Sequence, residues 1–331
     1  MKKIITISLI LAVFLVVFAG AACAAPKHVL RLGHNAGLQE PTHLAAVYFA
    51  DELKKRSNGD VVVNVFPSGQ LGDQVNIAEA VMEGTIDVSV NTAVTLSNWL
   101  PQLTVLDLPY LFFDTKEADA VFSGELIELL DELIGGLKLE VLGWGENGFR
   151  QFYNNVRPIN AVADFKGLKV RSMSSPIAVQ ILQSWGTIPT PMPWMETMTG
   201  LQQGTVDGGE GPLVVWAGAQ MGTAVKYISI TNHQYTTGMI FASKATMGKL
   251  PSEVAELVRE VGSDAGAYMK EISRKMEEEA RNSLEAAGAV VNVVPDEVRR
   301  EMAELTKGIY TANRESIGPE FYDRFMKLLG K

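Results

Sequence analysis

Two arginines are the residues of this sequence best suited to bind an acid. Arg150 follows a glycine-rich segment at 143–148, and Arg171 ends a short predicted strand. A guanidinium group pairs with a carboxylate through two parallel hydrogen bonds, which a lysine cannot reproduce. A structural ion pair is the alternative role for either residue. Both arginines are therefore candidate ligands for the carboxylate of an organic acid.

The residues that usually carry catalysis or bind metals are sparse. No two histidines are spaced three or four residues apart, and no HExxH or G-x-S-x-G segment occurs. This argues against a zinc site and against a nucleophile elbow. A Ser-His-Asp triad stays open, because its members need not be neighbours in sequence. We expect a protein that is not an enzyme and that holds no metal and no cofactor.

The segment GWGENG at 143–148 matches the G-x-G-x-x-G pattern of dinucleotide-binding loops. That function requires a helix to begin directly after the glycines and present its N–H groups to a phosphate. The residues that follow, 149–158, are instead typical of extended chain and turns. We expect the glycines to form a bend where the chain crosses between two domains.

The N-terminus has the pattern of an export signal. Two lysines precede an apolar run at 4–18, which is shorter than the roughly 20 residues that span a bilayer, and small residues follow. We predict a signal peptide at 1–24 and a periplasmic protein. The only cysteine, Cys23, lies within this signal, and a lipid-modified N-terminus at Cys23 is the alternative.

The remaining 307 residues are long enough for two domains. Without the two lysines of the signal, 27 basic residues stand against 38 acidic ones, a net charge of −11. This charge argues against nucleic acid or an anionic membrane as a partner. No disulfide is available, so a hydrophobic core must stabilise the fold.

Alternating strands and helices predict an α/β fold with mostly parallel strands. Predicted strands are 28–33, 61–66, 86–90, 137–144 and 168–173, and predicted helices are 42–55, 73–82, 118–133, 176–185 and 196–203. The residues assigned to one face of the first helix are Leu44, Val47, Tyr48, Ala50 and Leu53. Three prolines in 187–193 indicate a rigid, extended connector, and 205–212 reads as a glycine-rich strand and turn.

The segment 252–287 predicts one long helix. It contains no proline, and its apolar residues recur at gaps of three and four. A helix of 36 residues is about 54 Å long, which exceeds the width of one domain. We therefore expect it to lie across both domains. Two helices, broken at Gly262 or Gly266, are the alternative.

Several motifs occur together in a specific order. They are SNGDVVVNVFPSGQLGD (57–73), EAVMEGTIDVSV (79–90), LPYLF (108–112), GFRQFYN (148–154), FKGLKVRSMSSP (165–176), PTPMPWME (189–196), LQQGTVDGGEGP (201–212) and TNH (231–233). With these motifs the chain resembles the DctP-type solute-binding subunit of the tripartite ATP-independent periplasmic (TRAP) transporters. The resemblance covers essentially the whole chain after the signal.

The resemblance implies an α/β fold of two domains with a cleft between them and a long helix spanning both. Domain I would comprise 25–147 and about 237–277, and domain II 148–236 and about 278–331. Such a protein captures a small organic acid and delivers it to the membrane permease subunits of an ion-coupled transporter. We expect a monomer without catalytic activity.

The resemblance also assigns binding residues. Arg171 matches the arginine that pairs with the ligand carboxylate, Arg150 a second arginine near it, and Trp194 an aromatic residue that packs over the ligand. Further candidates for ligand binding are Asn35, Thr92, Ser174, Glu210, Gly211 and Tyr235.

One position departs from the family pattern. Gly211 stands where an asparagine commonly contacts the ligand, and where members that bind 2-oxo acids through a metal carry tryptophan. This argues against a metal-bridged ligand. Trp194, with Trp144, Trp216 and Tyr235 near matched segments, favours an aromatic or otherwise apolar carboxylate.

Two other classes of protein share some of these features. The binding component of an ATP-driven importer also has an export signal, two domains and a cleft. A secreted hydrolase would require a nucleophile and base that the sequence does not reveal. A sensor or scavenger role within the same family also stays open.

Overall fold

The computed structural model describes residues 25–119 and 123–331. The predicted signal peptide at 1–24, and with it Cys23, lies outside the described residues. Within the described ranges, no helix is both long enough and apolar enough to cross a membrane.

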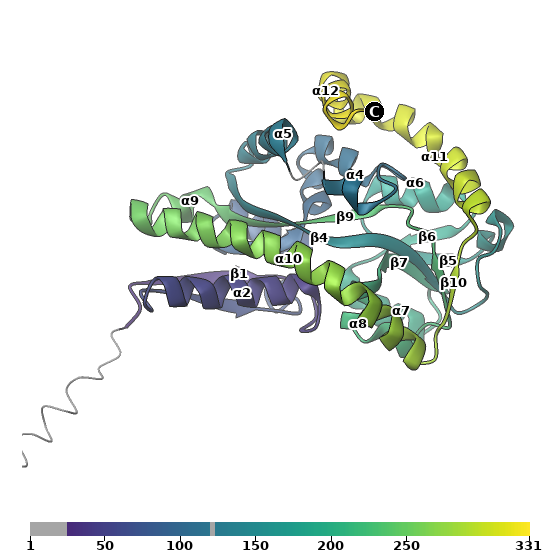
Figure 1. The fold of residues 1–331 in the computed structure, drawn as a ribbon, viewed down its shortest axis with the longest axis horizontal. Coiled ribbons are helices and arrows are strands. Elements are labelled where there is room, and N and C mark those ends of the chain that lie inside the picture. Colours follow the sequence, from purple (N-terminus) through teal and green to yellow (C-terminus); the bar gives the residue numbers. More distant parts are fainter. Residues whose placement is uncertain (1–24, 120–122) are drawn as a thin grey trace, which may run out of the picture.

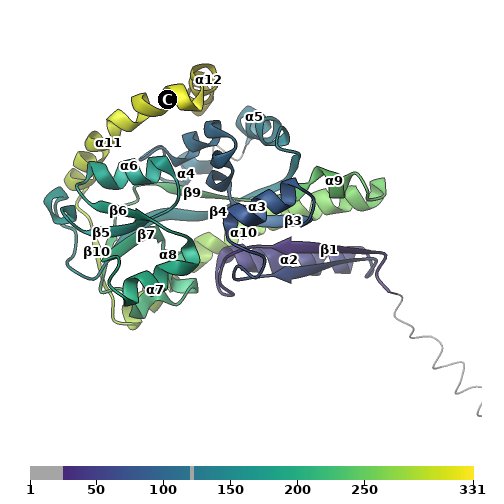
Figure 2. The same cartoon turned by 180° about the vertical axis from the view of Figure 1, so that it is seen from behind.

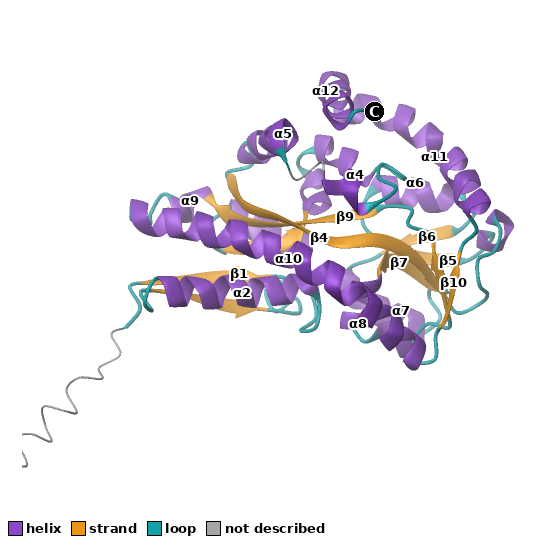
Figure 3. Cartoon of the chain, viewed as in Figure 1, coloured by secondary structure: helices purple, strands orange, loops and turns teal. Residues whose placement is uncertain are grey.

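The described chain folds as an α/β protein in which helices cover the strands of a mixed sheet (Figure 3). The strands are β1 (His28–Gly33), β2 (Val61–Phe66), β3 (Val88–Thr92), β4 (Leu139–Asn154), β5 (Lys169–Ser172), β6 (Ile188–Pro191), β7 (Gly208–Pro212), β8 (Tyr227–Ile230), β9 (Tyr235–Ser243) and β10 (Val290–Val293). The helices are α2 (Pro41–Arg56), α3 (Gln74–Met82), α4 (Thr115–Asp119), α5 (Gly124–Gly135), α6 (Pro176–Ser184), α7 (Thr197–Gln202), α8 (Leu213–Gly218), α9 (Lys244–Met247), α10 (Ser252–Ala286), α11 (Asp296–Ile317) and α12 (Pro319–Leu329). Short 3₁₀ helices include η2 (Ala93–Asn98), η3 (Pro101–Asp107) and η6 (Trp194–Glu196).

The strand order is β2-β1-β3-β9-β4-β7-β5-β6, with β8 paired to β4 and β10 to β8. Strands β1 to β3 pair in parallel on one side, and β5 to β7 on the other. We call these the β1–β3 half and the β5–β7 half. The long antiparallel strands β4 and β9 lie between the halves (Figure 2). The two halves are therefore joined through these central strands.

The segment 143–148 lies inside β4, so the strand predicted at 137–144 is longer than expected. No helix begins after the glycines, which removes the arrangement that phosphate binding requires. The strand does not end at these glycines: β4 runs on, with shifts in its register to β9 between Val141 and Gly143 and between Glu146 and Gly148. Such irregularities increase local strand twist without ending the strand.

Helix α10 is a single helix of 35 residues, as the unbroken pattern predicts, and the alternative of a break at Gly262 or Gly266 is wrong. It packs against β4, against α2 and against α8 (Figure 1). A Cβ on Gly262 would lie 2.4 Å from the Leu142 Cβ, and a Cβ on Gly266 2.6 Å from the Trp144 carbonyl oxygen. The two glycines therefore permit the close approach of α10 to β4.

The buried face of α2 differs from the predicted one. Its buried residues include Ala45, Ala46, Phe49 and Leu53, whereas Val47 is 36% exposed. The helix packs against both β2 and α10, so its buried face combines the two small alanines with the larger Phe49 and Leu53. Tyr48 is only half-buried and stacks on Tyr268 of α10, with ring centroids 4.5 Å apart.

Other local predictions agree closely with the structure. Asp73 caps α3, and its Oδ1 accepts hydrogen bonds from the backbone N–H groups of Val75 and Asn76, both at 2.9 Å. The proline-rich connector is extended but includes the short strand β6, which pairs with β5 at the edge of the sheet. An edge position tolerates prolines because one side of the strand needs no donors.

Candidate functional site

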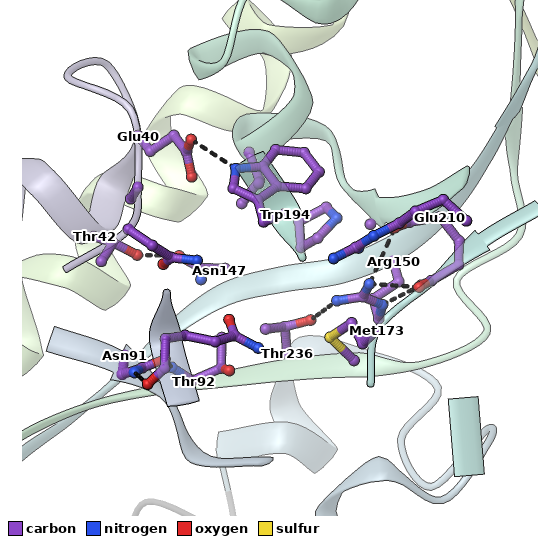
Figure 4. Close-up of a pocket in the computed structure, with 17 residues that line it drawn as sticks. Glu40, Thr42, Asn91, Thr92, Asn147, Arg150, Met173, Trp194, Glu210 and Thr236 are labelled. Atoms are coloured by element: carbon purple, nitrogen blue, oxygen red, sulfur yellow. Dashed lines mark hydrogen bonds and ion pairs between the residues drawn. The ribbon is translucent and has the colours of Figure 1, made fainter. Parts of the chain in front are cut away.

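A pocket lies where the two halves meet β4 and β9 (Figure 4), and its empty volume is about 540 Å³. The β1–β3 half contributes the loop after β1, the start of α2 and α3, and β3. The β5–β7 half contributes β5, η6, β7 and α8. The described residues that line the pocket are Asn35, Ala36, Glu40, Thr42, Gln74, Asn91, Thr92, Asn147, Arg150, Arg171, Met173, Trp194, Glu210, Gly211, Pro212, Val215 and Thr236.

Arg171 is a buried cation whose charge is not paired within the described chain. It is 4% exposed, and its Nε donates a hydrogen bond to the Met192 carbonyl oxygen at 3.2 Å. No described carboxylate forms a salt bridge with it, and its guanidinium carbon lies 5.4 Å from the centre of the Trp194 ring. Burial lowers the pKa of Arg171 to about 10. A buried charge without a partner is costly, so a carboxylate entering the pocket would be stabilised here.

Arg150, by contrast, is already paired. Its Nη2 donates to Glu210 Oε1 at 2.7 Å, its Nε bonds the other oxygen of the same carboxylate, and its Nη1 donates to Thr236 Oγ1 at 2.9 Å. Burial raises the pKa of Glu210, but the Arg150 guanidinium and the nearby His233, whose Nε2 lies 3.6 Å from Glu210 Oε2, hold that pKa well below its usual value. Arg150 lines the pocket with its charge compensated.

Glu40 is a pocket residue that the sequence did not reveal. It is 3% exposed, and its Oε1 accepts hydrogen bonds from the Gly37 N–H at 2.8 Å and from the Trp194 Nε1 at 3.4 Å (Figure 4). Burial raises the pKa of Glu40 to about 8. From sequence, an acidic residue directly before Pro41 and a helix reads as an N-terminal cap, which gives no hint of a pocket.

Uncharged polar side chains make up much of the remaining wall. Thr42 Oγ1 lies 3.4 Å from Asn147 Oδ1 (Figure 4). Thr92 Oγ1 lies 3.0 Å from Thr95 Oγ1, outside the lining. Of these polar residues, the sequence identified only Asn35 and Thr92. The polar or charged pocket residues that it missed are Glu40, Thr42, Gln74, Asn91, Asn147 and Thr236, and the apolar ones are Ala36, Met173, Pro212 and Val215. They come from several separate loops, helices and strands, and no local motif joins them.

The structure brings seven of the nine expected site residues to this pocket: Asn35, Thr92, Arg150, Arg171, Trp194, Glu210 and Gly211. Ser174 is exposed and is not among the lining residues, whereas its neighbour Met173 is. Tyr235 is buried outside this pocket, where its hydroxyl hydrogen-bonds Glu146. Glu146 in turn accepts hydrogen bonds from Arg274 of α10.

A steric contact explains why position 211 is occupied by glycine. A Cβ on Gly211 would lie 2.6 Å from Trp216 Nε1, and a Cβ on Gly209 would lie 2.9 Å from Cζ2 of the same ring. Trp216 is fully buried and stacks on Tyr153, with ring centroids 3.9 Å apart. The indole therefore occupies the space that a side chain at 211 would need.

Trp144 and Trp216, the other tryptophans noted in the sequence, are not among the described lining residues. Trp144 donates through its Nε1 to Asp131 Oδ1 at 2.8 Å, and Trp216 lies behind β7. Trp194 is the one aromatic ring among the described lining residues. The same described residues contain no group of three or more histidines, cysteines or acids that could hold a metal ion.

Comparisons with known proteins agree with one another. The family described as bacterial extracellular solute-binding protein, family 7 (DctP), matches residues 32–316. The 2,3-diketo-L-gulonate-binding periplasmic protein YiaO of Escherichia coli K12 is 30% identical over 314 residues, which cover 95% of this chain and 91% of that protein.

Two solved structures are similar over nearly their whole length. The sugar acid binding protein DctPAm of Advenella mimigardefordensis, in complex with galactonate, has a TM-score of 0.88 and 27% identity, covering 92% of this chain and 98% of that one. A TRAP periplasmic solute binding protein of Ralstonia eutropha H16, with bound (S)-2-acetolactate, has a TM-score of 0.87 and 26% identity, covering 91% and 98%.

Proposed function

Because this chain belongs to family 7 of the bacterial extracellular solute-binding proteins, we propose that it captures a hydroxylated monocarboxylate and delivers it to the permease of a TRAP transporter. The family is a substrate-binding component of transport, and the proposed role includes no catalytic step. The two-domain fold and its helix α10 are those of this class of protein.

One observation carries the proposal: Arg171 is buried in the pocket without a described carboxylate partner. Arg150, the other lining arginine, is paired with Glu210. The pocket therefore offers one uncompensated positive charge, which a single ligand carboxylate would neutralise. The guanidinium could form two parallel hydrogen bonds with it, and this geometry favours a carboxylate over a hydroxyl or an amide.

The rest of the pocket supports a hydroxylated ligand more than the aromatic one that Trp194 suggested. Opposite one indole ring stand the uncharged polar side chains of Asn35, Asn91, Thr92 and Asn147. Such groups suit hydroxyls, since each can donate or accept a hydrogen bond. Galactonate, 2,3-diketo-L-gulonate and 2-acetolactate, the ligands named for three similar proteins, are all oxygenated monocarboxylates.

Capture would follow from movement of the two halves. The pocket is lined from both halves, so a ligand held by Arg171 would also contact the β1–β3 half when the cleft closes. Domain I at 25–147 and about 237–277, with domain II at 148–236 and about 278–331, is our proposed division. We also propose that the segment 1–24 directs export to the periplasm. We further propose that the protein is a monomer.

A screen of thermal stability tests this function. We expect sugar acids such as galactonate and erythronate to raise the melting temperature of the purified protein, because a ligand that binds only the folded state stabilises it. Galactitol and erythritol, which lack the carboxylate, are the matched controls and should have no effect. The proposal would be contradicted if the acids and the polyols stabilised the protein equally, or if neither stabilised it.

A further inference from the structure

Trp194 lies between two groups of opposite character. On one side, the Arg171 guanidinium carbon is 5.4 Å from the centre of the ring. On the other, the indole Nε1 donates to Glu40 Oε1 at 3.4 Å. Arg171 belongs to the β5–β7 half and Glu40 to the loop before α2. A ligand lying along the indole with its carboxylate on Arg171 would therefore direct its far end toward Glu40.

The Glu40 carboxyl has one oxygen available to a ligand. Oε1 accepts both of its hydrogen bonds, and Oε2 has no partner among the described residues although Glu40 is 3% exposed. Figure 4 shows the carboxyl beside Trp194, on the side of the pocket that holds Thr42 and Asn147. No described cation forms a salt bridge with Glu40. A buried carboxyl with a free oxygen is a strong hydrogen-bonding group.

We infer that Glu40 selects the end of the ligand opposite its carboxylate, hydrogen-bonding a hydroxyl group there and disfavouring a second carboxylate. This inference rests on the proposed function and narrows it to monocarboxylates. Among the charged lining residues, Arg150 and Glu210 neutralise each other and Arg171 takes one ligand carboxylate. A second carboxylate would meet Glu40 with no remaining lining cation to neutralise it.

The role of Glu40 can be tested by varying the pH, because its charge depends on its protonation. Below its pKa of about 8 the Oε2 carries the proton and donates a hydrogen bond; above it, the carboxylate repels a second anion. Titratable groups near Glu40 in the chain are His34 and His43, and Glu196 lies near Trp194; Arg171 lies across the indole, and the paired Arg150 and Glu210 line the same pocket. Burial lowers the pKa of both histidines, to about 3 for His34, so that they stay neutral above pH 7.

Calorimetry with matched acids tests the inference. The probes are galactonate with galactarate, and erythronate with meso-tartrate; each pair differs by one terminal carboxylate in place of a hydroxymethyl group. Wild type, Glu40→Gln and the control Glu196→Gln, which removes an exposed carboxylate near Trp194, are compared at about pH 7 and about pH 9.

For wild type and Glu196→Gln, we expect the monocarboxylate to bind more tightly, with a preference that grows at least about threefold from the lower to the higher pH. For Glu40→Gln we expect a smaller preference that does not change with pH. A dicarboxylate that binds wild type as tightly as its partner at pH 9, or the same pH dependence in Glu40→Gln, would overturn the inference alone. Binding of no acid by wild type would overturn the proposed function and the inference with it.

Discussion

Arg150 and Arg171 are equally buried arginines in one pocket, yet their surroundings assign them different roles. Antiparallel pairing of β4 with β7 brings Arg150 beside Glu210, whose carboxylate binds the guanidinium at two points. Arg171 on β5 has a backbone carbonyl and an indole ring for neighbours. The first arginine is thus paired within the fold, and on the proposed function the second stays available for a ligand at a cost in stability.

Substitution by methionine should separate these roles in the protein without ligand. Arg150→Met leaves the buried Glu210 without its guanidinium, so we expect the free energy of unfolding to fall by about 3–5 kcal/mol. Arg171→Met removes a buried charge that has no described partner, so the free energy should stay within about 1 kcal/mol of wild type or rise. Urea unfolding at neutral pH measures both. An equal loss for the two variants would show that Arg171 is also structurally paired.

The sequence motifs were sufficient to identify both arginines and Trp194, but they could not distinguish the arginines from each other. The difference depends on which strand lies beside each residue, and that is a property of the sheet. Glu40 was missed for a similar reason, because its pocket position comes from contact with Trp194, 154 residues later in the chain. Ser174 shows the reverse case: it lies within the matched motif at 165–176, but its side chain is exposed and its neighbour Met173 lines the pocket.

At the scale of elements, the packing of α10 on β4 determines how the two halves are joined. The helix was predictable from its apolar periodicity, because such a pattern needs only local information. Its glycines were ambiguous: in sequence they resemble a helix break, and in the structure they are the points of closest contact with Leu142, Gly143 and Trp144. Gly211 is also explained by a close contact, because the ring of Trp216 occupies the space that a side chain at 211 would need.

Alanine substitutions in two helices test this packing. By helix propensity alone, glycine to alanine in a helix interior should gain up to about 1 kcal/mol. We expect Gly308→Ala in α11 to do so, because its added Cβ would meet no atom within 4 Å. Gly266→Ala should instead lose about 1–3 kcal/mol, because its Cβ would approach the Trp144 carbonyl oxygen to 2.6 Å. Thermal unfolding of both variants measures these changes in stability, and a gain in stability for Gly266→Ala would contradict the close packing of α10 on β4.

At the scale of the whole molecule, the α/β class and the order of most elements followed from the alternation of strands and helices. The continuous central strand β4 did not, because its glycines favoured a bend. The pocket is lined from both halves and by β4 and β9, so its shape depends on how the halves sit about these strands. The proposed division into two domains predicts that the two halves move relative to each other about these strands.

Scattering in solution tests the movement directly. We expect the radius of gyration of the protein, measured by small-angle X-ray scattering, to fall when a bound sugar acid draws the halves together. The variant Arg171→Ala, given the same acid, should keep the larger value because it does not hold the carboxylate. An unchanged radius in wild type at saturating ligand would argue for a pocket that forms without domain closure.

The most direct test of the central claim is the affinity of Arg171→Ala for the acid that wild type binds in the stability screen. Isothermal titration calorimetry should show a loss of about 2–5 kcal/mol in binding free energy, which is roughly 30-fold or more in Kd. Arg300→Ala, which removes an exposed arginine of α11, should bind as wild type does. A change of less than about threefold in Arg171→Ala would contradict the account, because the ligand carboxylate would then be held elsewhere.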